Sequence, residues 1–346
     1  MLEERKQKVR KRIHLFLRLF VVAAACFLIF KNLDYQQFIA SFRHLRGWVI
    51  WTAAAVKILT EGGMAFRWWI LLRALGIPIP LRSAVRLHFH GLFFSGFLPS
   101  STGGDFIRAW YVTRHTDKRA LSALSVFADR FTGLFSTALI AAVSFFVFFR
   151  GRSLLGGRRE ELSWKISSYQ IWIYVLLAVL VLLLVFCLFS RRTRDRFTQF
   201  FKFLKKIGWK FFLYTREIIS VYFKKWWLFP LTVFITVLFQ SLTFVSFWLI
   251  GMDLGVSGQL KHYFVFFPLV WVIGVIPVSI AGLGILEGGV VLLFVNSAGA
   301  SAESAAALAV CQRALFLFGS IPGVFVHLKA DYLPKMKEHI FIDVPE

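Results

Sequence analysis

The sequence predicts an all-α, polytopic integral membrane protein with about six spanning helices and two opposed re-entrant helical hairpins in an inverted repeat. Three observations predict this class. Of the 346 residues, 58% are hydrophobic, and the mean hydropathy of +0.68 lies far above that of a soluble domain. Several apolar runs are long enough to cross the roughly 30 Å hydrocarbon layer as helices. Two further apolar segments, one in each half, are broken by proline and glycine.

Six apolar runs are expected to span the membrane within a single transmembrane domain over residues 1–346. They are Leu15–Phe30, Trp48–Leu72, Ala120–Phe149, Ile171–Phe189, Trp226–Ile250 and Ala302–Leu328. The first run follows a basic start, and no convincing cleavage site comes after Cys26, so we interpret it as an uncleaved signal anchor. The first half of the repeat is expected at 13–149 and the second at 226–328.

The two broken segments are Phe94–Arg108 and Trp271–Glu287, and in each a glycine follows a proline by five positions. Lipid cannot satisfy the N–H and C=O groups that a helix break frees, so such backbone must be buried in protein or line a cavity. Paired interruptions in two halves indicate a transporter site. We therefore expect re-entrant hairpins at 86–116 and 262–296. Their predicted hinge residues are Pro99, Gly103, Gly104, Pro277, Gly282 and Gly284.

Basic residues predict the orientation in the membrane. Residues 191–225 hold eleven Lys and Arg against two acidic residues, and the N-terminus is also basic. Such segments stay on the cytoplasmic side. We expect a multi-pass protein of the cell (inner) membrane with both termini in the cytoplasm. The 191–225 segment is predicted to be a basic amphipathic helix on the inner leaflet, with docking of a partner protein as the alternative.

Other functional classes find little support. The net charge is +23, but the basic residues flank membrane spans and no nucleic-acid-binding motif is present, so no nucleic-acid partner is expected. The three cysteines lie scattered in apolar runs with no metal or redox spacing. His88 and His90 diverge on a helix, and no cysteine or carboxylate joins them, so we expect no metal and no cofactor. No nucleophile–base pair indicates an enzyme.

Ionisable residues inside apolar runs are the candidate substrate-binding residues, because each costs roughly 2.5–3.5 kcal/mol to insert. They are Lys57, Glu61, Asp105, Arg108, Asp129, Arg130, Glu287 and Arg313. Lys57 and Glu61 lie four apart and are expected to pair. Asp129 and Arg130 are adjacent, so each is expected to find a partner elsewhere. The eight carry four charges of each sign, so a mutually neutralising network without substrate is the alternative.

The second helix of the first hairpin is expected to begin after Gly103 and Gly104. Its free N–H groups and positive helix end favour an anion such as a lipid phosphate. The corresponding helix near Gly282 offers the same feature, with Glu287 one to two turns further on.

Four motifs together resemble the lysylphosphatidylglycerol synthase transmembrane family. They are Gly91–Arg108, Ala128–Arg130, Pro277–Gly288 and Gln312–Arg313. The resemblance implies transbilayer movement of a lipid, opposed hairpins around a central cavity, and a homodimer as one assembly. It gives functional weight to Pro99, Gly103, Gly104, Asp105, Arg108, Asp129, Arg130, Gly282, Gly284, Glu287 and Arg313. The soluble aminoacyl-transferase domain of the full synthase has no counterpart here, so we expect a stand-alone member.

The expected function is flippase-like transport of a polar or cationic-headgroup (phospho)lipid across the cytoplasmic membrane by alternating access. Half-helix ends would hold the lipid phosphate, and Glu61, Asp129 and Glu287 would receive the headgroup. Membrane lipids are then the main partners. One alternative is a non-transporting membrane partner of a lipid, hopanoid or glycan biosynthetic enzyme. Another is an intramembrane lipid-headgroup transferase.

Overall fold

The computed structural model describes residues 33–97, 103–149 (except 115 and 117), 224–275 and 282–328. Within these ranges the chain forms nine α-helices and one 3-10 turn, and no strand. The elements are α2 (Tyr35–Ser41), η1 (Phe42–His44), α3 (Gly47–Ala74), α4 (Leu81–Phe97), α5 (Gly103–Val112), α6 (Arg119–Phe148), α9 (Leu228–Asp253), α10 (Leu260–Gly274), α11 (Ile285–Ala298) and α12 (Ala302–Leu328).

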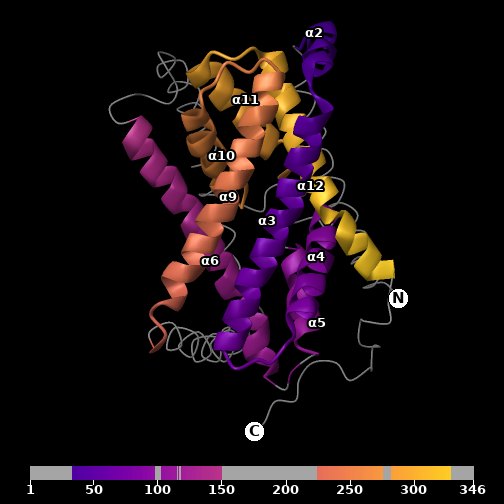
Figure 1. Ribbon diagram of the computed structural model, residues 1–346, viewed down its shortest axis with the longest axis vertical. Helices are drawn as coiled ribbons and strands as arrows, with labels where there is room; N and C mark the ends of the chain where they lie inside the picture. Colours follow the sequence, from indigo (N-terminus) through magenta and orange to yellow (C-terminus); the bar gives the residue numbers. More distant parts are fainter. Residues whose placement is uncertain are drawn as a thin grey trace, which may run out of the picture.

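Four helices, α3, α6, α9 and α12, are long and apolar enough to cross a membrane. They coincide with four of the six expected spans, which confirms the helical membrane class. In Figure 1 α3 and α12 run downward and α6 and α9 run upward. The expected spans at 15–30 and 171–189 lie outside the described residues, as does most of the basic segment at 191–225.

The two predicted interruptions are present as separate pairs of short helices. In the first segment α4 ends at Phe97 and α5 begins at Gly103, and in the second α10 ends at Gly274 and α11 begins at Ile285. Figure 1 shows α4 and α5 in the lower part of the molecule and α10 and α11 in the upper part. The hinge residues Pro99 and Pro277 lie outside the described residues.

Gly282 and Gly284 occupy the left-handed region, with φ of 74° and 84°. A side chain is strained in that conformation, so glycine suits the entry to α11. The Glu287 carboxylate accepts the backbone N–H of Gly284 at 2.7 Å, which caps the first turn of this helix. The role of these two glycines as a hinge stays a prediction.

The segments α3–α6 and α9–α12 use the same packing plan. Helix α3 packs along α9; α4 packs on α12, and α10 packs on α6. The second short helix of each pair also packs on the long helix that follows it, α5 on α6 and α11 on α12. Exchanging the two segments leaves this set of contacts unchanged. Each pair of short helices is thus held between long helices of both segments.

The long helices α3 and α9 also end in the same way. Gly76 and Gly255 each have φ of 71°, which suits a left-handed helix end. The residue after each glycine donates its backbone N–H to the carbonyl five residues back, at 3.0 Å after α3 and 2.8 Å after α9. The next helix begins five residues after the glycine in both cases.

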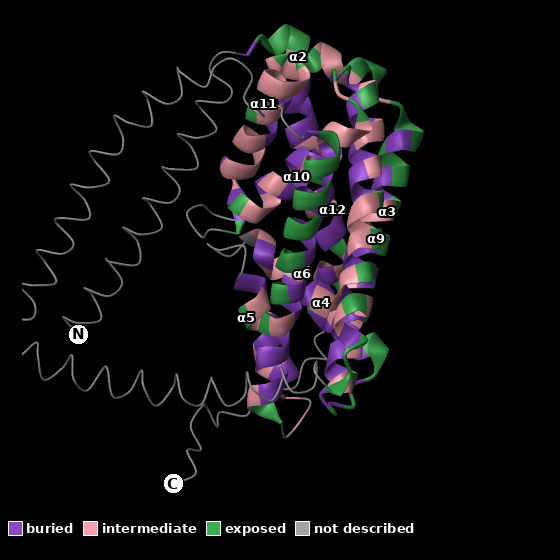
Figure 2. Ribbon diagram, turned by 90° about the vertical axis from the view of Figure 1, so that its left-hand side faces the viewer, coloured by how far each residue is buried: buried purple, intermediate pink, exposed green. Residues whose placement is uncertain are grey.

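Two apolar clusters fill the interior. One lies among α3, α4, α5 and α6, and includes the fully buried ring of Trp68. The other is rich in aromatic residues and lies mainly among α9, α10, α11 and α12; its fully buried rings include Tyr263, Phe266, Phe267 and Phe294. Figure 2 shows buried residues where helices face each other and exposed residues along the outer faces.

Helices α4 and α5 approach so closely that glycine is required where they cross. A Cβ atom added to Gly104 would overlap the Gly91 carbonyl oxygen and the Ser95 hydroxyl. One added to Gly91 would come within 2.8 Å of the Gly104 carbonyl oxygen. Backbone cannot yield as a flexible side chain does, so this crossing fixes the first pair of short helices.

We predict that Gly104→Ala lowers stability by about 1 to 3 kcal/mol, because the methyl group forces α4 and α5 apart. The measurement is the thermal midpoint of the purified protein in detergent. Gly62→Ala is the control, since a Cβ there meets no atom within 4 Å and alanine favours a helix. A Gly104→Ala midpoint equal to that of Gly62→Ala would contradict the close crossing.

Candidate functional site

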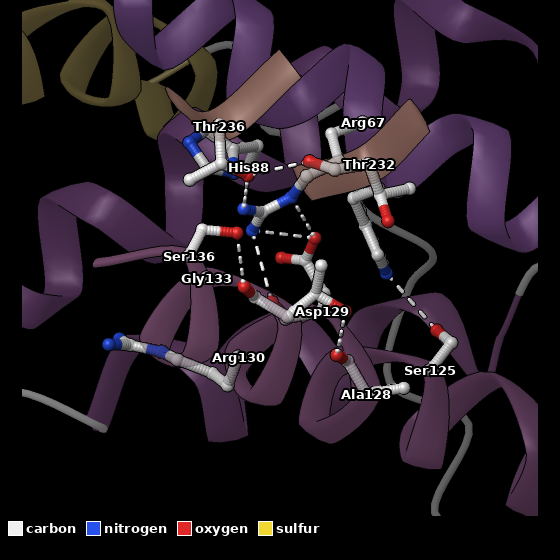
Figure 3. A network of polar contacts seen from close by, with 12 residues as sticks. Arg67, His88, Ser125, Ala128, Asp129, Arg130, Gly133, Ser136, Thr232 and Thr236 are labelled. Carbon is white, nitrogen blue, oxygen red and sulfur yellow. Dashed lines mark hydrogen bonds and ion pairs between the residues drawn. The ribbon is translucent and has the colours of Figure 1, made fainter. Parts of the chain in front are cut away.

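The carboxylate of Asp129 on α6 is buried and bound by two arginines, Arg67 and Arg108, and Figure 3 shows the contact with Arg67. Arg67 on α3 donates its Nε to Oδ1 at 2.9 Å, and Arg108 on α5 donates from its terminal nitrogen to Oδ2 at 3.0 Å. Arg67 also donates to the Asp129 carbonyl at 3.1 Å and to the Thr236 hydroxyl of α9 at 2.6 Å. These bonds join four helices at one carboxylate.

An aromatic ring completes the surroundings of this carboxylate. The guanidinium carbon of Arg108 lies 4.5 Å from the ring centroid of Trp68, a cation–π arrangement. The indole N–H of Trp68 donates to the Ser125 hydroxyl at 3.1 Å. Arg67, Arg108 and Asp129 are each 5% exposed or less, so their charges are shielded from bulk water and stabilised mainly by one another.

A second carboxylate, Glu61 on α3, lies beside this group. Lys57 forms the expected ion pair with Glu61 one turn away. His88 on α4 connects Glu61 to Arg108: its Nε2 lies 3.0 Å from the Glu61 carboxylate and its Nδ1 lies 3.1 Å from a terminal nitrogen of Arg108. An arginine can only donate, so Nδ1 must accept. Nε2 then carries the proton and donates to Glu61, which makes His88 neutral.

Arg130 lies apart from its neighbour in sequence. Figure 3 shows its side chain directed away from the Asp129 carboxylate. It forms an ion pair with Asp105 in the first turn of α5, and its side chain is 44% exposed. The expectation that Asp129 and Arg130 point to different sides and find separate partners is confirmed.

The second segment holds its own ion pair. Arg313 on α12 contacts the Glu287 carboxylate of α11 at 2.6 Å. The Phe316 ring lies near both groups of charges, with its centroid 5.7 Å from the Lys57 nitrogen and 5.9 Å from the Arg313 guanidinium carbon. The Phe316 ring thus lies between the Glu287–Arg313 pair of the second segment and Lys57 of the first.

The eight predicted residues all take part in these contacts, together with two that sequence reasoning missed. We call the ten residues the charge network: Lys57, Glu61, Arg67, His88, Asp105, Arg108, Asp129, Arg130, Glu287 and Arg313. Arg67 was detectable, since it is a third ionisable residue in an apolar run. With His88 neutral, the network holds five positive and four negative groups. The four-to-four balance counted from the sequence leaves out Arg67.

His88 and His90 have different partners. His88 bonds to Glu61 and Arg108, whereas His90 lies 3.3 Å from the His327 ring nitrogen of α12. Across the described ranges no group of three or more His, Cys, Asp or Glu is arranged to hold a metal ion.

One pair of contacts occurs in both segments. Asp105 is the third residue of α5 and Glu287 the third of α11. Their partners, Arg130 and Arg313, are each the twelfth residue of the following long helix. An acidic residue in the first turn of a short helix thus binds an arginine in the middle of the next helix, twice.

The rest of the charge network belongs to the first segment alone. Counted from the same helix ends, its six residues all have neutral counterparts in the second segment. The pairs are Lys57 with Thr236, Glu61 with Gln240, Arg67 with Ser246, His88 with Phe267, Arg108 with Val290 and Asp129 with Gln312. The two segments therefore share a scaffold but differ in the polarity of the interior.

This fold and this interior define the class of the protein: a multi-pass helical membrane protein with a buried charge network. The family model for the lysylphosphatidylglycerol synthase TM region matches residues 15–323, so the chain belongs to that family. A search of curated proteins found no match.

We predict that Arg67→Met destabilises the protein by about 3 to 5 kcal/mol, because a buried carboxylate loses a charged partner. Arg130→Met is the matched control. Its pair with Asp105 is partly exposed, and such pairs contribute about 1 kcal/mol or less. Thermal midpoints in one detergent compare the two. Equal midpoints would mean that the Arg67–Asp129 contact does not hold α3 against α6.

Proposed function

We propose that this protein is a flippase-like lipid transporter. It moves a polar or cationic-headgroup (phospho)lipid across the cytoplasmic membrane by alternating access. The observation that carries this function is the charge network: ten polar side chains from α3, α4, α5, α6, α11 and α12 in an apolar helical protein, of which all but Arg130 are buried or partly buried. Charges at such a depth are costly, and in membrane proteins they mark substrate or ion pathways.

The arrangement of the two segments supports a transporter. Transporters of this kind contain inverted repeats whose broken helices meet near the middle of the membrane. Here the matched packing of α3–α6 and α9–α12, the matched ends of α3 and α9 and the repeated ion pairs favour such a repeat. The pairs α4–α5 and α10–α11 then act as re-entrant hairpins that enter from opposite sides (Figure 1).

Basic residues favour the lower end in Figure 1 as cytoplasmic. Among the described residues, eight Lys and Arg lie in or beside the helix ends there, against three at the other end. The eight are Arg73, Arg82, Arg86, Arg114, Lys118, Arg119, Lys224 and Lys225, and the three are Arg43, Arg46 and Lys261. Helices α6 and α9 both run upward, which the expected crossing at 171–189 would explain. The protein then has both termini in the cytoplasm.

The charge network offers partners for the phosphate of a lipid and for the cationic or polar group attached to it. Its surplus positive charge favours an anion, and Arg108 has a buried Nε without a hydrogen-bond partner in the described part of the chain. A lipid phosphate suits this donor. The carboxylates of Glu61, Asp129 and Glu287 would receive a cationic or polar headgroup. Rocking of one repeat against the other would expose the site to each side in turn.

The test is transport in reconstituted liposomes that carry a fluorescent phospholipid, with a quencher added from one side. We expect the protein to accelerate quenching of inner-leaflet lipid. Asp129→Asn and Arg313→Gln should slow this about tenfold or more, since a hydrogen bond to a charged group contributes about 1.5 to 3 kcal/mol. Arg46→Gln is the control: its ion pair with Asp253 lies at the end of the bundle, with the Arg46 side chain 55% exposed.

Each alternative has its own outcome in this assay. Failure to accelerate quenching with any lipid, by protein that elutes as a folded species, would contradict transport and favour a partner of a biosynthetic enzyme. A modified lipid in the extract would instead indicate a headgroup transferase. A mixture of neutral, anionic and cationic headgroups separates the substrate classes.

A further inference from the structure

We propose that transport is coupled to protons, with His88 as the proton-binding residue and Arg108 as the group that couples it to an anionic ligand. When Arg108 turns from His88 to a lipid phosphate, Nδ1 of His88 becomes free to take a proton. This inference rests on the proposed function and adds an energy source to it.

The hydrogen bond from Arg108 to His88 and the protonation of His88 at Nδ1 exclude each other. Nδ1 of His88 accepts from Arg108 at 3.1 Å, so a proton on that nitrogen would face another donor. His88 therefore cannot be protonated while Arg108 holds this position. Its Nε2 already donates to Glu61 at 3.0 Å, and this bond strengthens if the ring becomes charged. Removal of Arg108 thus leaves a histidine with an acidic partner and one open nitrogen.

The charge count leads to the same conclusion. With His88 neutral the network already holds one positive charge more than negative charges, so adding a proton is unfavourable. A phosphodiester that binds Arg108 brings one negative charge. Turning the guanidinium from His88 toward this phosphate removes the donor from Nδ1, and the phosphate's negative charge offsets that of the proton. Anion binding and proton uptake should therefore occur together.

Charged and titratable groups lie on each helix packed on α4, and two of them, Glu61 and Arg108, contact His88. On α3 these are Lys57 and Glu61, and on α5 they are Asp105 and Arg108. Asp129 of α6 lies behind Arg108.

Two residues of α12 complete this set: Arg313 binds Glu287, and His327 stacks on His90 two positions further along α4. Of the two histidines on α4, His88 contacts carboxylate and guanidinium groups, whereas His90 contacts His327 and aromatic rings.

The measurement is the number of protons taken up as a ligand binds. Calorimetric titration of the full-length protein in two buffers with different ionisation heats gives this number directly. Short-chain phosphatidylglycerol is the probe, because its phosphodiester keeps a constant charge around pH 7. We expect uptake approaching one proton per bound lipid. The affinity of wild-type protein should then fall as the pH rises, by up to about tenfold per pH unit.

Two substitutions locate the proton. His88→Gln keeps one donor and one acceptor but cannot titrate, so proton uptake should fall to near zero while lipid still binds. His90→Gln, on the same helix, should take up as many protons as wild type. His88→Asn is a second neutral replacement if His88→Gln does not fold. A titration with sulfate in place of lipid tests the anion alone. Proton uptake with both ligands would mean that any bound anion drives it. Proton uptake with lipid but not with sulfate would mean that the lipid itself is needed.

The outcomes separate the coupling from the transport proposal. Lipid binding without proton uptake, or equal uptake by wild type and His88→Gln, would overturn the role of His88 and leave transport intact. Failure of folded wild-type protein to bind any phospholipid would contradict the proposed function itself.

Discussion

The arrangement of the first segment depends on the ion pairs that the Asp129 carboxylate forms with Arg67 and Arg108. A buried charge is tolerated only with good partners, and Asp129 has two arginines from different helices. The bonds fix α3, α5 and α6 relative to one another, and Arg67 extends the connection to α9 through Thr236. Helix α5 has ten residues, too few for stability on its own, and Arg108 ties it into the interior.

The two segments show how one scaffold can carry an asymmetric site. Three features are common to both segments and define the shared scaffold. They are the glycines after α3 and α9, the order of the helices and the carboxylate–arginine pairs. Apart from Asp105 and Arg130, the charge-network residues of the first segment have neutral counterparts in the second, which packs an aromatic cluster. The first segment thus holds most of the charge network, and the second contributes the Glu287–Arg313 pair and a largely apolar interior.

The positions of the long helices, the breaks between short helices and one ion pair were predictable from the sequence, because each depends on residues close together in the chain. Apolar runs located the long helices, proline and glycine located the breaks, and the four-residue spacing identified the pair of Lys57 and Glu61. The partners of Asp129 were not predictable, since residues 62 and 21 positions away meet it only after the helices pack. The contacts of His88 were not predictable either, because the sequence raised only the question of a metal ligand. In the structure His88 lies between the guanidinium of Arg108 and the carboxylate of Glu61.

The central claim is that the charge network lies between two helix pairs that enter the membrane from opposite sides. Labelling with a membrane-impermeant thiol reagent in intact cells tests it most directly. In a background where the three native cysteines are replaced by serine, Ser257→Cys reports the entrance to α10 and Arg82→Cys the entrance to α4. Both positions are exposed. The account predicts that Ser257→Cys reacts in intact cells and Arg82→Cys only after permeabilisation; equal labelling of both from one side would contradict it.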